Sequence, residues 1–213
     1  MQKWLDLIRG SLAEAAVDDL KLGAEKPPMP FSDARLLSTL THTLWFLPTV
    51  ASCEAMANLL AERHNVFFHD YQVIVAAGSK AGMGVDAVMP VRKAMGDPLI
   101  TKTITLSCGK LTTGVTVPEW TAVMMLTGSA STAASGYMQT IFRVQSAGVL
   151  DGKQKERCYV FDFAPDRALN VISEVNRITK RGRTNEEQNR VALGEFLNFC
   201  PVIAVDGTQM TAY

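Results

Sequence analysis

The sequence has 213 residues, of which 47% are hydrophobic, and its 21 basic side chains balance 21 acidic ones. A chain of this length and composition can bury a core, so it is not expected to be disordered. The net charge of zero excludes a strong overall attraction to nucleic acid or to an anionic membrane. Any contact with phosphate must therefore come from a local patch or from backbone amides.

The N-terminal part of the chain is expected to be helical. Apolar residues recur at helical spacing over residues 3–20, and the proline-rich run at residues 26–30 then interrupts any helix. A short helix over residues 34–40 follows, with Ser32 or Asp33 as its N-cap.

From residue 42 onward, apolar runs alternate with amphipathic segments. Strands are predicted over residues 42–47, 71–77, 99–107, 121–126 and 157–163, and helices over residues 51–63, 85–95, 136–144 and 164–178. Strands that alternate with helices form a parallel sheet, and strands that are apolar throughout are covered on both faces. The predicted fold class is therefore α/β, with a parallel sheet, helices on both of its faces and helical extensions at both ends. Such sheets bind ligands at the loops after the carboxyl ends of the strands.

The sequence carries no targeting signal and no metal-binding pattern. Its N-terminus lacks the charged-then-apolar order of a signal peptide, and no apolar run is long enough to span a bilayer. We expect a cytoplasmic protein without a membrane partner. The four cysteines are too far apart for a zinc knuckle or a CxxC motif, so we expect reduced, mostly buried thiols and no metal site. They are Cys53, Cys108, Cys158 and Cys200.

A nucleotide-hydrolysing P-loop is missing from the sequence. Such a loop ends in Gly-Lys-Ser/Thr, where the hydroxyl binds the magnesium ion. Gly109-Lys110 is followed by Leu111, and Gly152-Lys153 by Gln154. There is also no acidic Walker B motif after an apolar strand. We therefore expect this chain alone to be inactive as an ATPase and to need no cofactor by itself.

The segment over residues 103–118, followed by the strand at 121–126, resembles motif V of superfamily 2 helicases. In that motif a strand leads into a loop that ends in an Arg/Thr-Gly-aliphatic-Asp-x-Pro signature. The run from Thr113 to Pro118 reads Thr-Gly-Val-Thr-Val-Pro. It is similar to the Thr-Gly form of type I and type III restriction motors.

Residues 137–146 resemble motif VI, whose pattern is Gln-x-x-Gly-Arg-x-x-Arg on a helix. Gln139 and Arg143 fall on matching positions, and residues four apart share one helix face. The resemblance implies that Arg143 reaches ATP bound on another domain. An arginine there offsets the charge that develops on the transferred phosphoryl group.

The strand at 42–47 with Pro48 and Thr49 resembles motif IV, so the three motifs occur in the family's order. The resemblance implies a RecA-like, C-terminal helicase domain over residues 41–178. A helical linker segment (1–40) would precede it, and the start of a C-terminal extension (179–213) of a larger protein would follow.

The function implied by the resemblance is that of a C-terminal motor lobe of a restriction-associated, ATP-dependent DNA helicase or translocase. ATP and Mg²⁺ would bind between this lobe and an N-terminal RecA-like lobe of the same parent, which would carry the Walker motifs and hold the metal. Gly114 and Thr116 would face the nucleotide, near the catalytic Gln139 and Arg143. The phosphate backbone of DNA would contact Thr49, Ser52, Lys110, Thr112 and Thr113.

Several positions depart from the family pattern and leave alternatives open. The acidic residue of motif V is Thr116 here, and motif VI has Phe142 for its glycine and Ser146 for its second arginine. One alternative is therefore a degenerate, non-catalytic helicase-like interaction domain. Another is a free-standing doubly wound enzyme with a small-molecule site, although no nucleophile–base pair supports it. Thr49 and Ser52 also suit an ordinary helix N-cap.

Overall fold

The computed structural model describes residues 1–9, 30–78, 85–111, 114–128, 134–150 and 152–164, together with residues 166, 167, 170, 174, 187, 191, 203–206 and 209–212. The chain divides into two compact units. One consists of residue 1 and residues 38–164, and the other consists of residues 2–37 and 165–213. The first unit contains the sheet.

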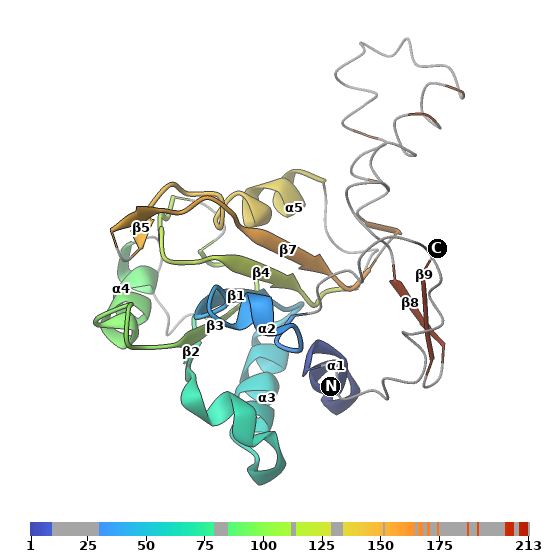
Figure 1. Ribbon diagram of the computed structural model, residues 1–213, viewed down its shortest axis with the longest axis horizontal. Coiled ribbons are helices and arrows are strands. Elements are labelled where there is room, and N and C mark those ends of the chain that lie inside the picture. The colour runs from blue at the N-terminus through green and yellow to red at the C-terminus, as the bar shows by residue number, and fades with distance from the viewer. Residues whose placement is uncertain are drawn as a thin grey trace. The chain divides into compact units, whose positions relative to one another are not determined.

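Five parallel strands form the sheet of the first unit, in the order β2-β3-β1-β4-β7 (Figure 1). The strands are β1 (His42–Phe46), β2 (Gln72–Val75), β3 (Thr103–Ser107), β4 (Ala122–Met125) and β7 (Tyr159–Asp162). Each lies within a predicted strand. The predicted α/β fold class with a parallel sheet is thus confirmed.

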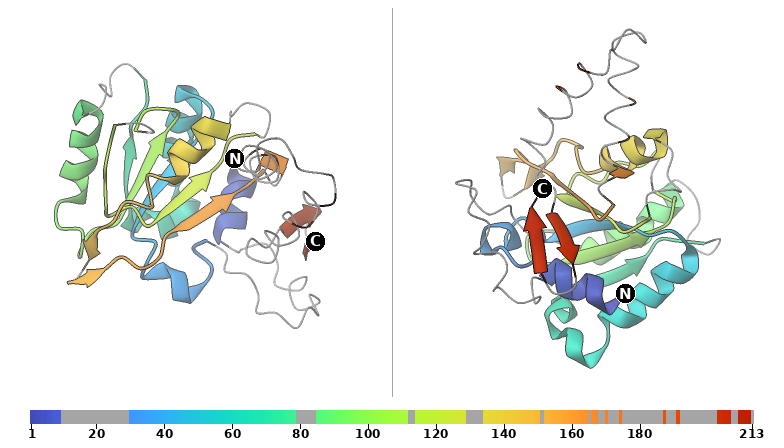
Figure 2. Two further views of the ribbon diagram at one scale, coloured as in Figure 1. Left: turned by 90° about the horizontal axis from the view of Figure 1, so that it is seen from above. Right: turned by 90° about the vertical axis from the view of Figure 1, so that its right-hand side faces the viewer.

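Helices cover both faces of this sheet, as predicted. They are α3 (Val50–Leu60), α4 (Val85–Met95) and α5 (Ala134–Ile141), with the 3₁₀ segment η2 (Arg63–Asp70) after α3. Figure 2 shows α3 and α5 on opposite sides of the sheet. The chain passes through α3 from β1 to β2 and returns through α4 from β2 to β3. Because crossovers are right-handed, these opposite directions place α3 and α4 on opposite faces.

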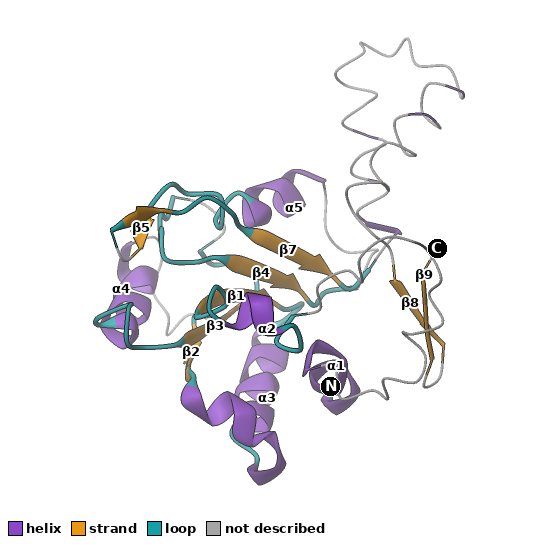
Figure 3. Ribbon diagram, viewed as in Figure 1, coloured by secondary structure: helices purple, strands orange, loops and turns teal. Residues whose placement is uncertain are grey.

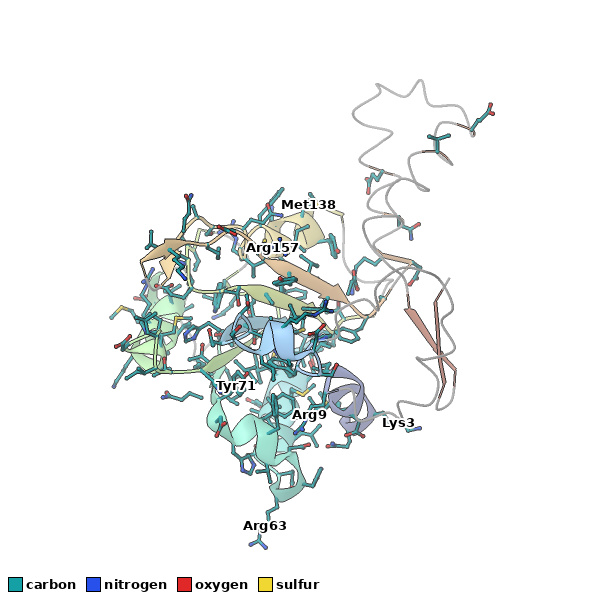
Figure 4. The ribbon with its side chains drawn as sticks, in the orientation of Figure 1. Lys3, Arg9, Arg63, Tyr71, Met138 and Arg157 are labelled. Atoms are coloured by element: carbon teal, nitrogen blue, oxygen red, sulfur yellow. The ribbon has the colours of Figure 1, made fainter. Side chains whose placement is uncertain are left out.

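The core of the unit lies around the three central strands. All residues of β3 and β4 and the first four residues of β1 are buried. Trp45 on β1 meets Phe68 of η2 edge to face, with ring centroids 6.0 Å apart. Tyr71, the residue before β2, is labelled in Figure 4. Its hydroxyl donates to the Leu40 carbonyl at 3.3 Å. Of these strands only β4 is apolar throughout, since β1 begins His-Thr and β3 alternates threonine with aliphatic residues before ending in serine.

The third strand begins later than the sequence indicates. It was predicted to start at residue 99, but residues 97–101 form a turn and β3 begins at Thr103. Asp97 organises this turn, since its carboxylate accepts the Leu99 N–H at 3.0 Å and its carbonyl accepts the Thr101 hydroxyl at 2.9 Å. An aspartate that binds its own following backbone competes with strand formation. Ile100 is therefore exposed (81%) rather than part of the sheet.

A short hairpin that the sequence analysis did not identify precedes β7. It consists of β5 (Val149–Leu150) and β6 (Lys153–Gln154), which pair antiparallel. Gly152, with φ +69°, lies in its turn. Two-residue strands are too short to show an alternating pattern, so the sequence offered only this glycine as a signal.

The second unit contains helices α1 (Gln2–Arg9) and α2 (Ala34–Leu37) and a hairpin of β8 (Ile203–Asp206) and β9 (Gln209–Ala212), coloured by type in Figure 3. Asp33 caps α2, because its carboxylate accepts the Arg35 N–H at 2.9 Å. The second half of the predicted helix 3–20, and most of the predicted helix 164–178, lie outside the described residues. In the described part of the chain, no helix is long and apolar enough to cross a membrane.

Candidate functional site

The topology of the sheet singles out the carboxyl end of β1. The connection after β1 passes through α3 toward one edge, whereas the connections after its neighbours β3 and β4 lead toward the other edge. In doubly wound sheets, ligands bind in the crevice created by such a reversal. The carboxyl ends are level here, because the Leu47 N–H donates to Ser107 O at 2.8 Å and the Leu126 N–H to Phe46 O at 2.9 Å.

Thr49 and Ser52 lie at this end of the sheet as a reciprocal cap of α3. The Ser52 N–H donates to Thr49 Oγ1 at 3.1 Å, and the Thr49 N–H donates to Ser52 Oγ at 2.9 Å. This is the ordinary N-cap that the sequence also allowed, and it satisfies otherwise unpaired helix N–H groups. The role of both hydroxyls in binding DNA phosphate stays a prediction.

The loop after β2 comes close to the first turn of α3. Gly78 has φ +75°, and a Cβ added there would lie 3.2 Å from Cγ1 of Val50. A residue with a side chain would thus meet both an unfavourable backbone conformation and a tight contact. Glycine at this position lets the β2 loop approach the capped end of α3.

The β3–β4 connection begins with a tight turn at the same end of the sheet. The Ser107 hydroxyl donates to the Lys110 carbonyl, and Gly109 and Leu111 have φ of 120° and 67°. Leu111 is buried and Lys110 is half-buried. Thr112 and Thr113 lie outside the described residues, and their contact with DNA stays a prediction. Gly114 follows with φ +66°, a backbone conformation that favours glycine.

Two arginines hold the next part of this connection. Arg92 of α4 donates Nη2–H to the Thr116 carbonyl at 2.9 Å. Arg143 donates Nη1–H to the Val115 carbonyl and Nε–H to the Gln139 carbonyl, the latter at 3.2 Å. Val115 and Val117 are buried on either side of exposed Thr116. The structure thus brings Arg143 of the motif VI segment against Val115 of the motif V segment, and the Gln139 carbonyl helps to hold its guanidinium.

Arg143 lies beyond the end of α5, although the helix was predicted to continue to residue 144. α5 ends at Ile141, and the chain continues in i→i−3 turns, such as the Arg143 N–H to the Thr140 carbonyl at 3.1 Å. Gln139 lies on α5 and Arg143 lies in the turn after it, so the prediction that one helix carries both residues is wrong. The tighter turns free the last carbonyls of the helix for other donors.

Lys155 holds the turn that follows α5. Its ammonium group donates to three carbonyl oxygens, those of Pro118 at 2.8 Å, Val144 at 2.9 Å and Trp120 at 3.2 Å. Burial lowers the pKa of Lys155, and the charge of Glu119 partly opposes this. Lys155 was missed by the sequence analysis, because a lysine that binds backbone carbonyls has no sequence signature.

The predicted site residues therefore fall into two groups at opposite ends of the strands. Trp120 and Thr121 lie at the amino ends, since the Thr121 N–H donates to the His42 carbonyl at 3.0 Å. Lys155 joins Trp120 to Val144, the residue after Arg143. Arg143 thus lies toward the amino ends, and Figure 1 shows α5 running back along the strands. The capped Thr49–Ser52 turn lies at the carboxyl ends, and the β3–β4 connection runs from one end to the other.

Cys53 is not suited to act as a nucleophile. Burial, together with the neighbouring thiol of Cys108, raises the pKa of Cys53 to about 12, so Cys53 is a protonated thiol at neutral pH. Cys53, Cys108 and Cys158 are free, and Cys200 lies outside the described residues. Among the residues that the structure describes, no three His, Cys, Asp or Glu side chains come together to hold a metal ion.

One curated protein is similar in sequence to this chain along most of its length. The chain is 31% identical over 209 residues to the C-terminal part of a putative type II restriction enzyme and methyltransferase of Mycoplasma pneumoniae. The match covers 95% of this chain, which spans 28% of that relative's length. No family model matches the sequence.

Two solved structures are similar at low sequence identity. An ATP-dependent Type ISP restriction-modification enzyme, LlaBIII, bound to DNA, aligns with 89% of this chain and 11% of its own, at 12% identity and a TM-score of 0.47. Domain 2 of the DEAD-box helicase Mss116p, bound to an RNA duplex, aligns with 75% of this chain and 77% of its own, at 13% identity and a TM-score of 0.30. The assignment of the fold class rests on the sheet topology itself.

Proposed function

We propose that this chain is the C-terminal motor lobe of an ATP-dependent DNA helicase or translocase that works with a restriction-modification protein. The observation that carries the proposal is the contact of Arg143 with Val115, which joins the motif VI segment to the motif V segment. These two residues are 28 positions apart in the chain. The similarity to a restriction enzyme and methyltransferase over 95% of the chain supports the restriction association.

In this proposal ATP lies between this lobe and an N-terminal RecA-like lobe that carries the Walker motifs and holds Mg²⁺. Arg143 contacts the γ-phosphoryl group of ATP while it is transferred and offsets the charge that develops on it. Arg143 has N–H groups to spare, because a guanidinium carries five and only two of them donate to the carbonyls of Val115 and Gln139. Gln139, Gly114 and Thr116 line the same side of the cleft.

The DNA contact in this proposal lies at the other end of the strands. Thr49, Ser52 and Lys110 lie near the carboxyl end of β1, and a reversal of strand order of this kind is where doubly wound sheets bind ligands. The N–H groups of a helix N-terminus suit a phosphate, and contacts of this kind bind DNA without reading its sequence. Thr112 and Thr113 belong to the same proposed contact.

The test is ATP hydrolysis by a protein that contains this chain together with its N-terminal motor lobe, with and without DNA. The Arg143→Ala variant is expected to lower a DNA-stimulated kcat by about a thousandfold. Arg157→Ala is the control, since Arg157 is exposed just before β7 (Figure 4). A wild-type rate that Arg143→Ala leaves unchanged would remove Arg143 from the mechanism.

A second candidate function is a non-catalytic interaction domain with a helicase-like fold. The observation in its favour is Ser146, which stands where motif VI has its second arginine and donates its hydroxyl to the Arg143 carbonyl at 3.2 Å. A serine used in this way stabilises a turn and contributes no charge. The absence of any DNA-stimulated ATPase in the intact two-lobe protein would favour this function.

A further inference from the structure

We propose that Arg92 is the second cation of a phosphate-binding site, which it forms with Arg143 and the hydroxyl of Thr116. The inference deepens the proposed function and rests on it for the identity of the ligand, the phosphate groups of a nucleoside triphosphate. It assigns a role to Arg92, which lies in α4 and outside every helicase-like motif of the sequence.

The first support is the convergence of two distant arginines on one dipeptide. Arg92 comes from α4 and binds the carbonyl of Thr116, 24 residues away. Arg143 comes from the turn after α5 and binds the carbonyl of Val115, 28 residues away. Both guanidinium groups are therefore held at consecutive residues of the β3–β4 connection.

The second support is the conformation of that dipeptide. Burial alternates from Val115 to Thr116 to Val117, as in an extended segment with one covered face. In such a segment the side chain of Thr116 faces away from those of its two neighbours. Thr116 is therefore exposed beside the two consecutive carbonyls that Arg92 and Arg143 bind.

The third support is charge. In the described residues of this unit, neither guanidinium takes part in an ion pair, and the groups that hold both are neutral carbonyl oxygens. Two positive charges near one exposed hydroxyl favour a multivalent anion. Arg92 donates one of its five N–H groups here and Arg143 two of its five, so each keeps donors in the fork geometry that matches a phosphate.

In this proposal the guanidinium of Arg92 replaces the positive charge that motif VI would have at position 146, where this chain has Ser146. The sequence lacks the second arginine of motif VI, and α4 brings a guanidinium to the neighbouring carbonyl instead. A competing explanation is that Arg92 only fastens the connection to α4. Two measurements on Arg92→Gln separate the two, because the loss of a fastening contact lowers the Tm, whereas the loss of a phosphate ligand lowers the affinity for the anion.

The first experiment measures binding of inorganic tripolyphosphate to this 213-residue chain by calorimetry at low salt. Arg92→Gln and Arg143→Gln are each expected to weaken binding by about tenfold or more. The control is Lys93→Gln, which removes an exposed charge from the next position of α4 and is expected to change binding less than about twofold. No binding to the wild type, or equal losses in the Lys93 and Arg92 variants, would overturn the site.

The second experiment measures ATP hydrolysis by the two-lobe protein with Arg92→Gln. A rise in KM for ATP or a fall in kcat of about tenfold, with no change in Lys93→Gln, would support the inference. ATPase that depends on Arg143 but not on Arg92 would overturn it and leave the proposed function intact. Tripolyphosphate binding that needs both arginines, in a protein without ATPase, would uphold the site and reject the proposed motor.

Discussion

Lys155 donates its ammonium group to the carbonyl oxygen of Val144, 2.9 Å away, and so holds the residue that follows Arg143. The same ammonium binds the carbonyls of Pro118 and Trp120, which end the β3–β4 connection. Both segments that meet at Arg143 are therefore tied to one lysine. Lys155 therefore fastens the turn that follows α5 to the end of the β3–β4 connection.

Removal of this ammonium group is expected to destabilise the sheet unit. Lys155→Met keeps the apolar stem but leaves three carbonyls without their donor, so the free energy of unfolding should fall by about 2 kcal/mol. Urea unfolding followed by circular dichroism measures the change. Lys153→Met, at an exposed position of β6, should remain within about 0.5 kcal/mol of the wild type. Equal stability of the two variants would contradict a structural role for Lys155.

Gly148 is required by close packing against Pro118. A Cβ added at Gly148 would lie 2.6 Å from Cβ of Pro118 and 3.4 Å from its carbonyl oxygen. Gly148→Ala must therefore push the β5–β6 hairpin away from the connection, at a cost of about 1–3 kcal/mol. Gly128→Ala is the matched control, because nothing lies within 4 Å of its added Cβ. Thermal unfolding should show a lower Tm for the Gly148 variant alone, and equal Tm values would refute the packing argument.

The stability of the fold is expected to depend on pH through His42. Its Nε2 lies 2.9 Å from the Pro98 carbonyl and its Nδ1 lies 2.9 Å from Thr103 Oγ1. A carbonyl only accepts, so Nε2 carries the proton and Nδ1 accepts from the hydroxyl, which is the neutral ring. Burial lowers the pKa of His42 below its ordinary value near 6.5, and the backbone bond to Pro98 and the charge of Glu119 partly oppose this.

The sign of the effect follows from proton binding. Between the folded pKa of His42 and about 6.5, the unfolded chain binds more protons than the folded protein, so stability falls as the pH falls. The free energy of unfolding should therefore decrease from pH 7.5 to pH 5.5 in the wild type and less so in His42→Gln. His64→Gln, at an exposed position, should keep the wild-type dependence. A pH dependence unaffected by His42→Gln would show that another group causes it.

Thr49 allows its capping role to be separated from its predicted contact with DNA. Thr49→Ala removes the cap and should lower the free energy of unfolding by about 1 kcal/mol, whereas aspartate also caps and should preserve stability. Both changes should weaken binding of a DNA duplex, and Thr49→Asp more so, because a carboxylate repels phosphate. Fluorescence anisotropy at a fixed salt concentration measures the affinity.

The control for this experiment adds the same charge farther along α3. Asn58→Asp, at an exposed position near the other end of the helix, should leave DNA affinity close to that of the wild type. If Thr49→Asp binds DNA as tightly as the wild type does, Thr49 is a cap and nothing more.

Much of the fold is predictable from local patterns. The helix over 85–95 has its predicted limits, and the strand at 42–47 differs from β1 by one residue. The cap at Thr49 and Ser52 was also recognisable, because both partners of a capping box are three residues apart. The predicted start of β3 at residue 99 was wrong, since Asp97 binds the backbone of the following turn and prevents an extended conformation.

The sequence by itself determined the order of strands and helices, the α/β class and the positions of the motif-like segments, because hydrophobic periodicity and caps act between near neighbours. Only the tertiary structure decided that β1 lies between β3 and β4, that α5 ends before Arg143, and that Arg92 and Lys155 reach the β3–β4 connection. These contacts join residues 24 to 37 positions apart and end on backbone carbonyls. Every residue has such a carbonyl, so only the packing of the folded chain selects which of them an arginine or a lysine binds.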